Sequence, residues 1–188
     1  NTLAYSYDGI NWTGIGTSVV DTSVNVVAWN GSYWLAGSQG TTNKLATSKD
    51  GINWVGLGGA STFSSVLDLV WTGSSWVAGG SPNGNTNAGV IAYSLNDGAS
   101  WTTVTSPISG SVYGLSSNRQ RIVALGSTTT LGSGNTIAYS KDIFGTSWLG
   151  VGTSTFNTTD KQIFRIVWFN GKFLAFANDT TSNNRIGY

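Results

Sequence analysis

One unit of sequence recurs along the 188 residues, and this repetition constrains the fold more than any other feature. Each copy has two apolar stretches, a third stretch similar to Ile-Ala-Tyr-Ser, and a fourth that opens on Trp after a turn containing Gly. Self-similarity with a period of roughly 20–50 residues is typical of architectures whose units pack on their neighbours. The first stretches read VNVVAW (24–29), VLDLVW (66–71), SVYGLS (111–116) and IFRIVW (163–168).

Every stretch is short and rich in β-branched or aromatic residues, and polar turn residues bound it, which is the pattern of β-strands joined by tight turns. Asn30–Gly31 and Asn170–Gly171 separate first and second stretches, and Asn-Gly favours two-residue hairpins. No segment has helical periodicity. Four short strands in a repeat of this length indicate a propeller blade. We therefore predict an all-β fold, a β-propeller of about four four-stranded antiparallel blades.

We expect one repeat domain over residues 1–188. Pairing of the N- and C-terminal strands is one way to close the ring, and it would remove an exposed sheet edge. An excerpt of a longer array and half of a larger ring made by two chains fit the same pattern. In the closed arrangement, the blades cover residues 24–58, 66–104, 111–151, and 163–188 together with 1–16.

The phrase between the third and fourth strands is the best-preserved part of the repeat. It reads SYDGINW at 6–12 and SKDGINW at 48–54, with looser copies at 94–101 and 140–148. Asp accepts hydrogen bonds from nearby backbone N–H groups, Gly adopts left-handed backbone, and Trp buries a large ring. We interpret the phrase as a structural turn. Its residues are Ser6, Asp8, Gly9, Trp12, Ser48, Asp50, Gly51, Trp54, Ser94, Asn96, Gly98, Trp101, Ser140, Asp142, Gly145 and Trp148.

This phrase resembles the Asp-box, or BNR repeat, of sialidases and many other propellers. The copy at 94–101 has the common spacing, with Asn96 at the Asp position, whereas the first two copies are one residue shorter and the last is one longer. The resemblance implies a structural turn remote from any active site. Sialidases of this family use an arginine triad, a Tyr–Glu pair and an acid. The chain has no Glu, so it resembles the repeat family without the sialidase catalytic residues.

The composition excludes several classes of function. Charged residues make up 9% of the chain, against roughly 25% in an average protein, and the net charge is +1, so we expect no nucleic-acid partner. The absence of His and Cys excludes triad and thiolate catalysis. No apolar run approaches the roughly 18 residues of a membrane span, so we expect no membrane insertion. We predict a non-enzyme without cofactor or metal; a sialidase-like or other glycoside hydrolase is the alternative.

Four charged residues stand out from the repeat. Asp68 and Arg165 share one first-strand position, and a four-fold ring would place them across its axis, as an ion pair in a narrow channel or a polar site at its mouth. A buried unpaired charge is costly, so we expect each to have a polar partner. Arg119 and Arg121 form the only positive cluster, which is either a solvated hairpin or a contact for an anionic group or a neighbouring subunit.

All nine Trp residues occupy repeat positions, so we expect them to pack in the core. The loops between second and third strands, and between fourth and first strands, vary in length and are polar. Variable loops on a rigid scaffold commonly carry binding. We expect an adhesion or structural module at an extracellular or virion surface, whose loops on one face bind glycan, protein or copies of the same chain.

Overall fold

The computed structural model describes residues 1–58, 62–84, 90–128, 134–152, 156, 165–176 and 186–187. All regular elements in these ranges are β-strands, arranged in five antiparallel sheets. The prediction of an all-β chain with four-stranded antiparallel sheets is therefore confirmed.

Three of the sheets have four strands each, which follow one another across the sheet in chain order. The first contains β3 (Val24–Trp29), β4 (Trp34–Ser38), β5 (Leu45–Ser48) and β6 (Val55–Gly56). The second contains β7 (Phe63–Trp71), β8 (Trp76–Pro82), β9 (Val90–Ser94) and β10 (Thr102–Val104). The third contains β11 (Val112–Ser117), β12 (Ile122–Gly126), β13 (Ile137–Ser140) and β14 (Trp148–Gly152).

The two remaining sheets are smaller. One pairs β1 (Leu3–Tyr5) with β2 (Thr13–Gly16), and the other orders β15 (Arg165–Phe169), β16 (Lys172–Phe176) and β17 (Ile186–Gly187). No closed ring is found in the described residues. β17 lies along the edge of β16 that residues 2–6 were predicted to fill, and β1 pairs with β2 instead, so the predicted pairing of the two terminal strands is absent there.

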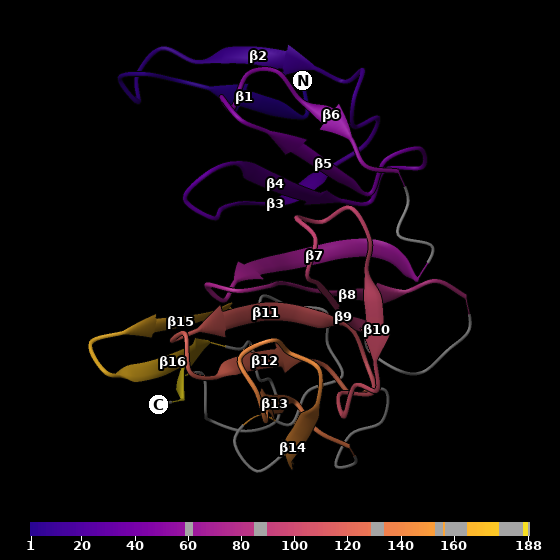
Figure 1. Ribbon diagram of the computed structural model, residues 1–188, viewed down its shortest axis with the longest axis vertical. Helices are drawn as coiled ribbons and strands as arrows, with labels where there is room; N and C mark the ends of the chain where they lie inside the picture. The colour runs from indigo at the N-terminus through magenta and orange to yellow at the C-terminus, as the bar shows by residue number, and fades with distance from the viewer. Residues whose placement is uncertain are drawn as a thin grey trace.

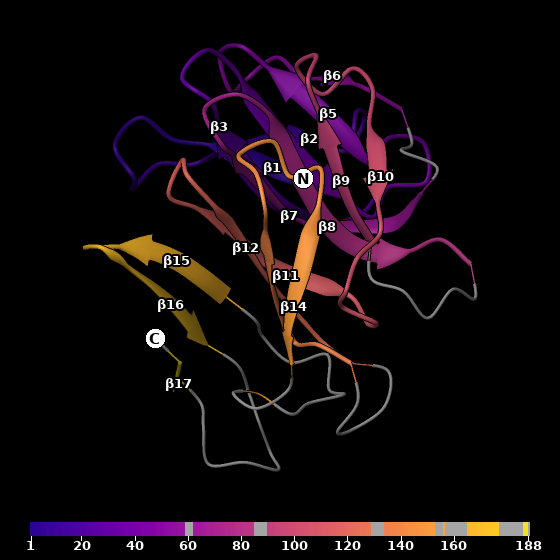
Figure 2. The same ribbon diagram turned by 60° about the horizontal axis from the view of Figure 1, so that its bottom comes forward.

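Successive sheets are neighbours in space. Figure 1 places β1–β2 and the N-terminus at one end of the long axis and β13 and β14 at the other, with β15 and β16 beside β11 and β12. Figure 2 shows β15–β17 on one side of β11 and β12, and β9 and β10 on the other. The first strands of successive sheets are neighbours, since β3 contacts β7, β7 contacts β11, and β11 contacts β15. The sheets of β7–β10 and β11–β14 therefore each have a neighbour on both faces.

The core lies between the sheets and follows the two-residue period of the strands. In β8, Trp76 and Ala78 pack in a cluster shared with the first four-stranded sheet, whereas Val77 packs in a cluster shared with the third. Successive side chains of a strand point to opposite faces, so a strand with neighbours on both faces is apolar throughout. This explains the unbroken apolar run of residues 76–80.

An aromatic pair closes the first hairpin in three of the sheets. Trp29 lies opposite Trp34 with ring centroids 4.9 Å apart, and Trp71 lies opposite Trp76 with centroids 5.4 Å apart. In the last sheet, Trp168 and Phe173 are 4.7 Å apart. Such cross-strand pairs stabilise a hairpin beyond the area they bury.

The prediction that every Trp is a core residue is wrong for two of them. Trp12 is 65% exposed and Trp29 is 43% exposed. Trp12 follows the turn of β1–β2, the outermost sheet of the described stack, and its ring lines an open cavity instead of a sheet interface. Trp29 ends β3, and Val27 of this strand lines the same cavity as residues of the small sheet. Burial of a repeated Trp thus depends on the sheet beside it.

One fully buried apolar side chain precedes or opens the first strand of each of the last four sheets. Phe63 and Phe156 occupy matching positions in the sequence, and the structure adds Val20 and Ile108 to the same set. The hydroxyl of Thr2 donates to the Val20 carbonyl at 3.1 Å, and that of Thr136 donates to the Phe156 carbonyl at 2.8 Å. In each of these four sheets, a buried apolar side chain therefore anchors the chain where it enters the first strand.

Two asparagines that sequence analysis did not single out form side-chain hydrogen bonds that connect neighbouring loops to each other. The Asn43 amide donates to Val19 O at 2.8 Å and accepts from Gly58 N at 3.0 Å. The Asn135 amide donates to Pro107 O at 2.9 Å and accepts from Gly152 N at 2.7 Å.

We expect Asn135→Ala to lower the free energy of unfolding by about 2 kcal/mol, because the Gly152 N–H and the Pro107 carbonyl lose their partner. Urea denaturation measures the difference. Gln120→Ala, a change on the exposed β11–β12 hairpin, is the control and is expected to stay within about 0.5 kcal/mol of the parent chain. Equal effects of the two substitutions would show that the Asn135 bridge adds no stability.

The described residues contain no helix with the length and apolarity needed to cross a membrane.

Candidate functional site

The two shortest copies of the repeated phrase form the same hydrogen-bonded turn. Asp50 Oδ1 accepts from Ile52 N at 2.9 Å and Asn53 N at 2.7 Å, and its Oδ2 accepts from Asn53 Nδ2 at 2.8 Å. The Ser48 hydroxyl donates to Asp50 Oδ1 and accepts from Gly51 N. The Asp8 turn makes each of these bonds with the corresponding residues.

The two looser copies reach a similar turn with different donors. Asn96 Oδ1 accepts from the Ser94 hydroxyl and from Ser100 N, each at 3.0 Å. Asp142 accepts from Phe144 N at 2.9 Å and from both the amide and the hydroxyl of Thr146. Ser140 differs from its counterparts, because its hydroxyl is directed to the backbone of β12 and accepts from Ile122 N at 2.8 Å.

All four copies share one bond from the indole. Its Nε1–H donates to the carbonyl of the Gly three residues earlier, at 3.2, 3.0, 2.9 and 2.9 Å for Trp12, Trp54, Trp101 and Trp148. The four glycines have positive φ, as the turn requires. The tryptophan ring therefore closes the turn that precedes it.

The turn hydrogen bonds keep the aspartates ionised. The backbone N–H of Asn11 is the largest cause that holds the pKa of Asp8 well below its usual range, and Asn53 does the same for Asp50. Partial burial raises the pKa of Asp142, but the hydrogen bonds from Thr146 outweigh it and lower the pKa overall. These carboxylates thus act as permanent hydrogen-bond acceptors.

The third and fourth turns lie against the second strand of the preceding sheet. A Cβ built on Gly98 would lie 3.4 Å from a Leu35 methyl, and one on Gly145 would lie 2.7 Å from a Val77 methyl. The Ser75 hydroxyl, at the start of the same neighbouring strand, donates to Phe144 O at 3.1 Å. The turns therefore connect successive sheets.

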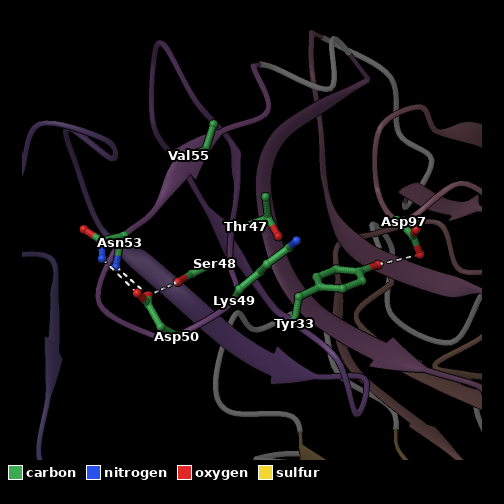
Figure 3. A pocket seen from close by; sticks show the side chains of 8 residues that line it. All are labelled: Tyr33, Thr47, Ser48, Lys49, Asp50, Asn53, Val55 and Asp97. Carbon is green, nitrogen blue, oxygen red and sulfur yellow. Dashed lines mark hydrogen bonds between the residues drawn. The ribbon is translucent and has the colours of Figure 1, made fainter.

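A cavity of about 480 Å³ lies where the first four-stranded sheet meets the turn of the second (Figure 3). Tyr33 comes from the β3–β4 hairpin, and Asp97 comes from the third turn. The other lining residues belong to β5, β6 and the turn between them, and they are Thr47, Ser48, Lys49, Asp50, Asn53 and Val55.

Tyr33 is fixed by two hydrogen bonds to the next sheet. Its hydroxyl accepts from the Nε1–H of the fully buried Trp76 at 2.6 Å and donates to Asp97 Oδ1 at 3.1 Å. Burial raises the pKa of Tyr33 to about 12, so the phenol stays protonated at neutral pH. Asp97 has φ 61°, a left-handed conformation that few residues other than Gly, Asn and Asp tolerate.

Asp68 lies in β7 and is buried, with backbone amides as partners. Its Oδ1 accepts from Leu69 N at 2.9 Å, and its Oδ2 accepts from Leu115 N of β11 at 2.7 Å. Burial raises its pKa to about 6, and the charge of the exposed Arg165 lowers it only as the smallest of the causes. No ion pair joins these two described residues, so the expected polar partner of Asp68 is backbone and not arginine.

Arg119 and Arg121 lie on the exposed β11–β12 hairpin. Arg119 has φ 67°, and the Arg121 guanidinium lies 4.7 Å from the centroid of the Tyr139 ring in the same sheet. Neither arginine lines the cavity of Figure 3. Most of the polar loops predicted to carry binding lie outside the described residues, including residues 85–89, 129–133 and 177–185.

No family model matches the chain, and no curated protein is found to be similar to it. In the part of the chain that the structure describes, no group of three or more Asp, Glu, His or Cys residues is arranged to hold a metal ion. Sequence analysis missed Tyr33, Lys49 and Asp97 as cavity residues. The one visible signal was that the Tyr33 position is occupied by Ser75, Arg121 and Lys172 in the other copies, a variation unusual in this regular repeat.

Proposed function

We propose that the chain is built of Asp-box β-propeller blades and acts as a non-catalytic adhesion or structural module at an extracellular or particle surface, where it binds glycan or protein. The observation that carries this proposal is that the turn aspartates already accept hydrogen bonds from their own turn. Both Asp50 oxygens accept hydrogen bonds within the turn, and its pKa is lowered. A general acid needs a raised pKa and an oxygen free to reach substrate.

The arrangement of the sheets supports the propeller assignment. Each complete sheet is a four-stranded antiparallel meander, and its first strand lies beside the first strands of its neighbours. The repeated turn occurs in every copy, and the third and fourth turns contact the preceding sheet, as a nearest-neighbour architecture requires. In such an array, low charge and polar turns suit a durable surface scaffold.

A turnover assay with fluorogenic aryl glycosides, including an aryl sialoside, tests the non-catalytic part of the proposal. We expect no release of the fluorophore above the buffer blank at any pH between 4 and 8. A glycan array and light scattering on the same preparation test the other part, with glycan binding or ordered self-association as the expected results. Sustained turnover of any glycoside would contradict the proposal.

A further inference from the structure

We propose that the cavity between the β5–β6 turn and the Asp97 turn binds a neutral saccharide residue. This inference rests on the proposed function, and it names the ligand class and its site. The site lies at the turn end of the sheets, away from the variable loops that sequence analysis favoured. Four observations carry it: the size of the cavity, its fixed aromatic wall, its charges, and a comparison with the next sheet interface.

The cavity has the dimensions and composition of a small-molecule site. Its volume of about 480 Å³ falls in the range of roughly 300–1,000 Å³ in which such sites occur. The Tyr33 ring and the 64% exposed Val55 provide apolar surface, while a few polar groups stand around them. An apolar surface with a few placed polar groups matches a pyranose, which has an apolar face and a rim of hydroxyls.

The aromatic wall is held in place before any ligand arrives. The Tyr33 hydroxyl is tied to Trp76 and to Asp97, which come from a different sheet. The ring therefore cannot rotate away without breaking two hydrogen bonds. A side chain that is already ordered loses little conformational entropy when a ligand packs on it.

The charges favour a neutral ligand over an anion. Lys49 makes no hydrogen bond or ion pair with another described residue, and Figure 3 shows it beside the Tyr33 ring. Asp97 uses Oδ1 for the tyrosine, which leaves Oδ2 as a further acceptor. Two carboxylates, Asp50 and Asp97, and one ammonium, Lys49, line the cavity, so its net charge is negative and disfavours an anion. A hydroxyl both accepts from an ammonium and donates to a carboxylate.

A cavity at the next sheet interface lacks the charged residues and a counterpart of Tyr33. It has a volume of about 440 Å³, and its lining includes Tyr93, Pro107 and Trp148 but no charged residue. Ser75 replaces Tyr33 there, and its hydroxyl is directed to Phe144 O. The molecule thus contains an internal comparison: a cavity of similar size at the next sheet interface that has the aromatic residues Tyr93 and Trp148 but no charged residue.

The test is a titration of the whole chain with neutral methyl pyranosides, followed by ¹H–¹⁵N NMR. We expect saturable shifts of the amides of Tyr33, Lys49 and Asp97. Asp97→Asn keeps a residue that tolerates left-handed backbone, and we expect it to weaken binding about tenfold or more because it replaces a charged acceptor. Lys49→Ala is expected to weaken binding as well. Lys141→Ala, at the same position of the fourth turn, is the matched control and is expected to bind as the parent does.

The remaining outcomes separate this inference from the proposed function. Shifts confined to the loops at the opposite end of the sheets, or glycan binding unaffected by Asp97→Asn, would overturn the saccharide site and leave a binding module. Tighter binding of a methyl glucuronide or of tetramethylammonium at Tyr33 would overturn the neutral ligand class. Absence of shifts with every probe would overturn the site, and turnover of a glycoside would overturn the proposed function instead.

Discussion

Replacing Gly145 with alanine is expected to lower the free energy of unfolding by about 3 kcal/mol, whereas the same change at Gly9 is expected to cost about 1 kcal/mol. Both residues have left-handed backbone, with φ of 77° and 73°. This conformation costs an alanine about 1–2 kcal/mol. At Gly145 a second cost arises, because the new methyl would lie 2.7 Å from Val77 and 3.2 Å from Ile122.

The steric overlap that causes this second cost cannot relax easily. Val77 and Ile122 are fully buried between the second and third sheets, and overpacking of such an interior costs about 1–3 kcal/mol. Nothing lies within 4 Å of a Cβ on Gly9, so that substitution carries the backbone cost alone. Urea denaturation of both variants measures the two losses. Equal losses of unfolding free energy in the two variants would mean that the fourth turn does not pack against the preceding sheet.

The free energy of unfolding is expected to fall by about 3 kcal/mol as the pH rises from 4 to 7, because of Asp68. Burial raises the pKa of this carboxyl from 3.8 to about 6. The folded chain therefore holds the Asp68 proton over a pH range in which the unfolded chain has lost it. Stability from this group is complete below the unfolded pKa and is lost as the pH rises through the folded pKa. A shift of about two units corresponds to about 3 kcal/mol.

Three turn aspartates act in the opposite direction at lower pH. The pKa values of Asp8, Asp50 and Asp142 are lowered in the folded chain, so the stability they contribute is lost as the pH falls below 4. The two effects together place the stability maximum near pH 4. The chain has no Glu, His or Cys to obscure this profile.

Denaturant unfolding at a series of pH values between 3 and 8 measures this profile. Asp68→Asn is the diagnostic variant, because it removes the titrating group while it keeps one acceptor for the two backbone amides. We expect the variant to lose the decline between pH 4 and 7. A parent chain whose stability stays level or rises over that range would contradict the assigned environment of Asp68.

The strands and their order within a sheet could be predicted because their signals are local. The apolar and β-branched residues of VLDLVW, the Asn30–Gly31 dipeptide and the repeated Asp-Gly turns each favour a backbone conformation within a few residues. Pairing within each four-stranded sheet follows from these turns, since strands joined by short turns are neighbours. The hydrogen-bonded form of the Asp50 turn is equally local.

Contacts between sheets could not be predicted in this way. The Tyr33–Trp76–Asp97 chain joins residues from two sheets, and it depends on how closely those sheets pack. The partner of Asp68 is a backbone amide of β11, which carries no side-chain signal in the sequence. The exposure of Trp12 depends on the outermost position of its sheet, although its turn matches that of the half-buried Trp54.

The most direct test of the structural role of the repeated turn is a ¹³C NMR titration of the carboxyl groups of Asp8 and Asp50. Acceptance of backbone and side-chain N–H bonds predicts midpoints well below the ordinary value of 3.8 and no response to added Ca²⁺. Midpoints at or above that value, or carboxyl shifts that follow the Ca²⁺ concentration, would contradict the account and assign these aspartates to chemistry or metal binding.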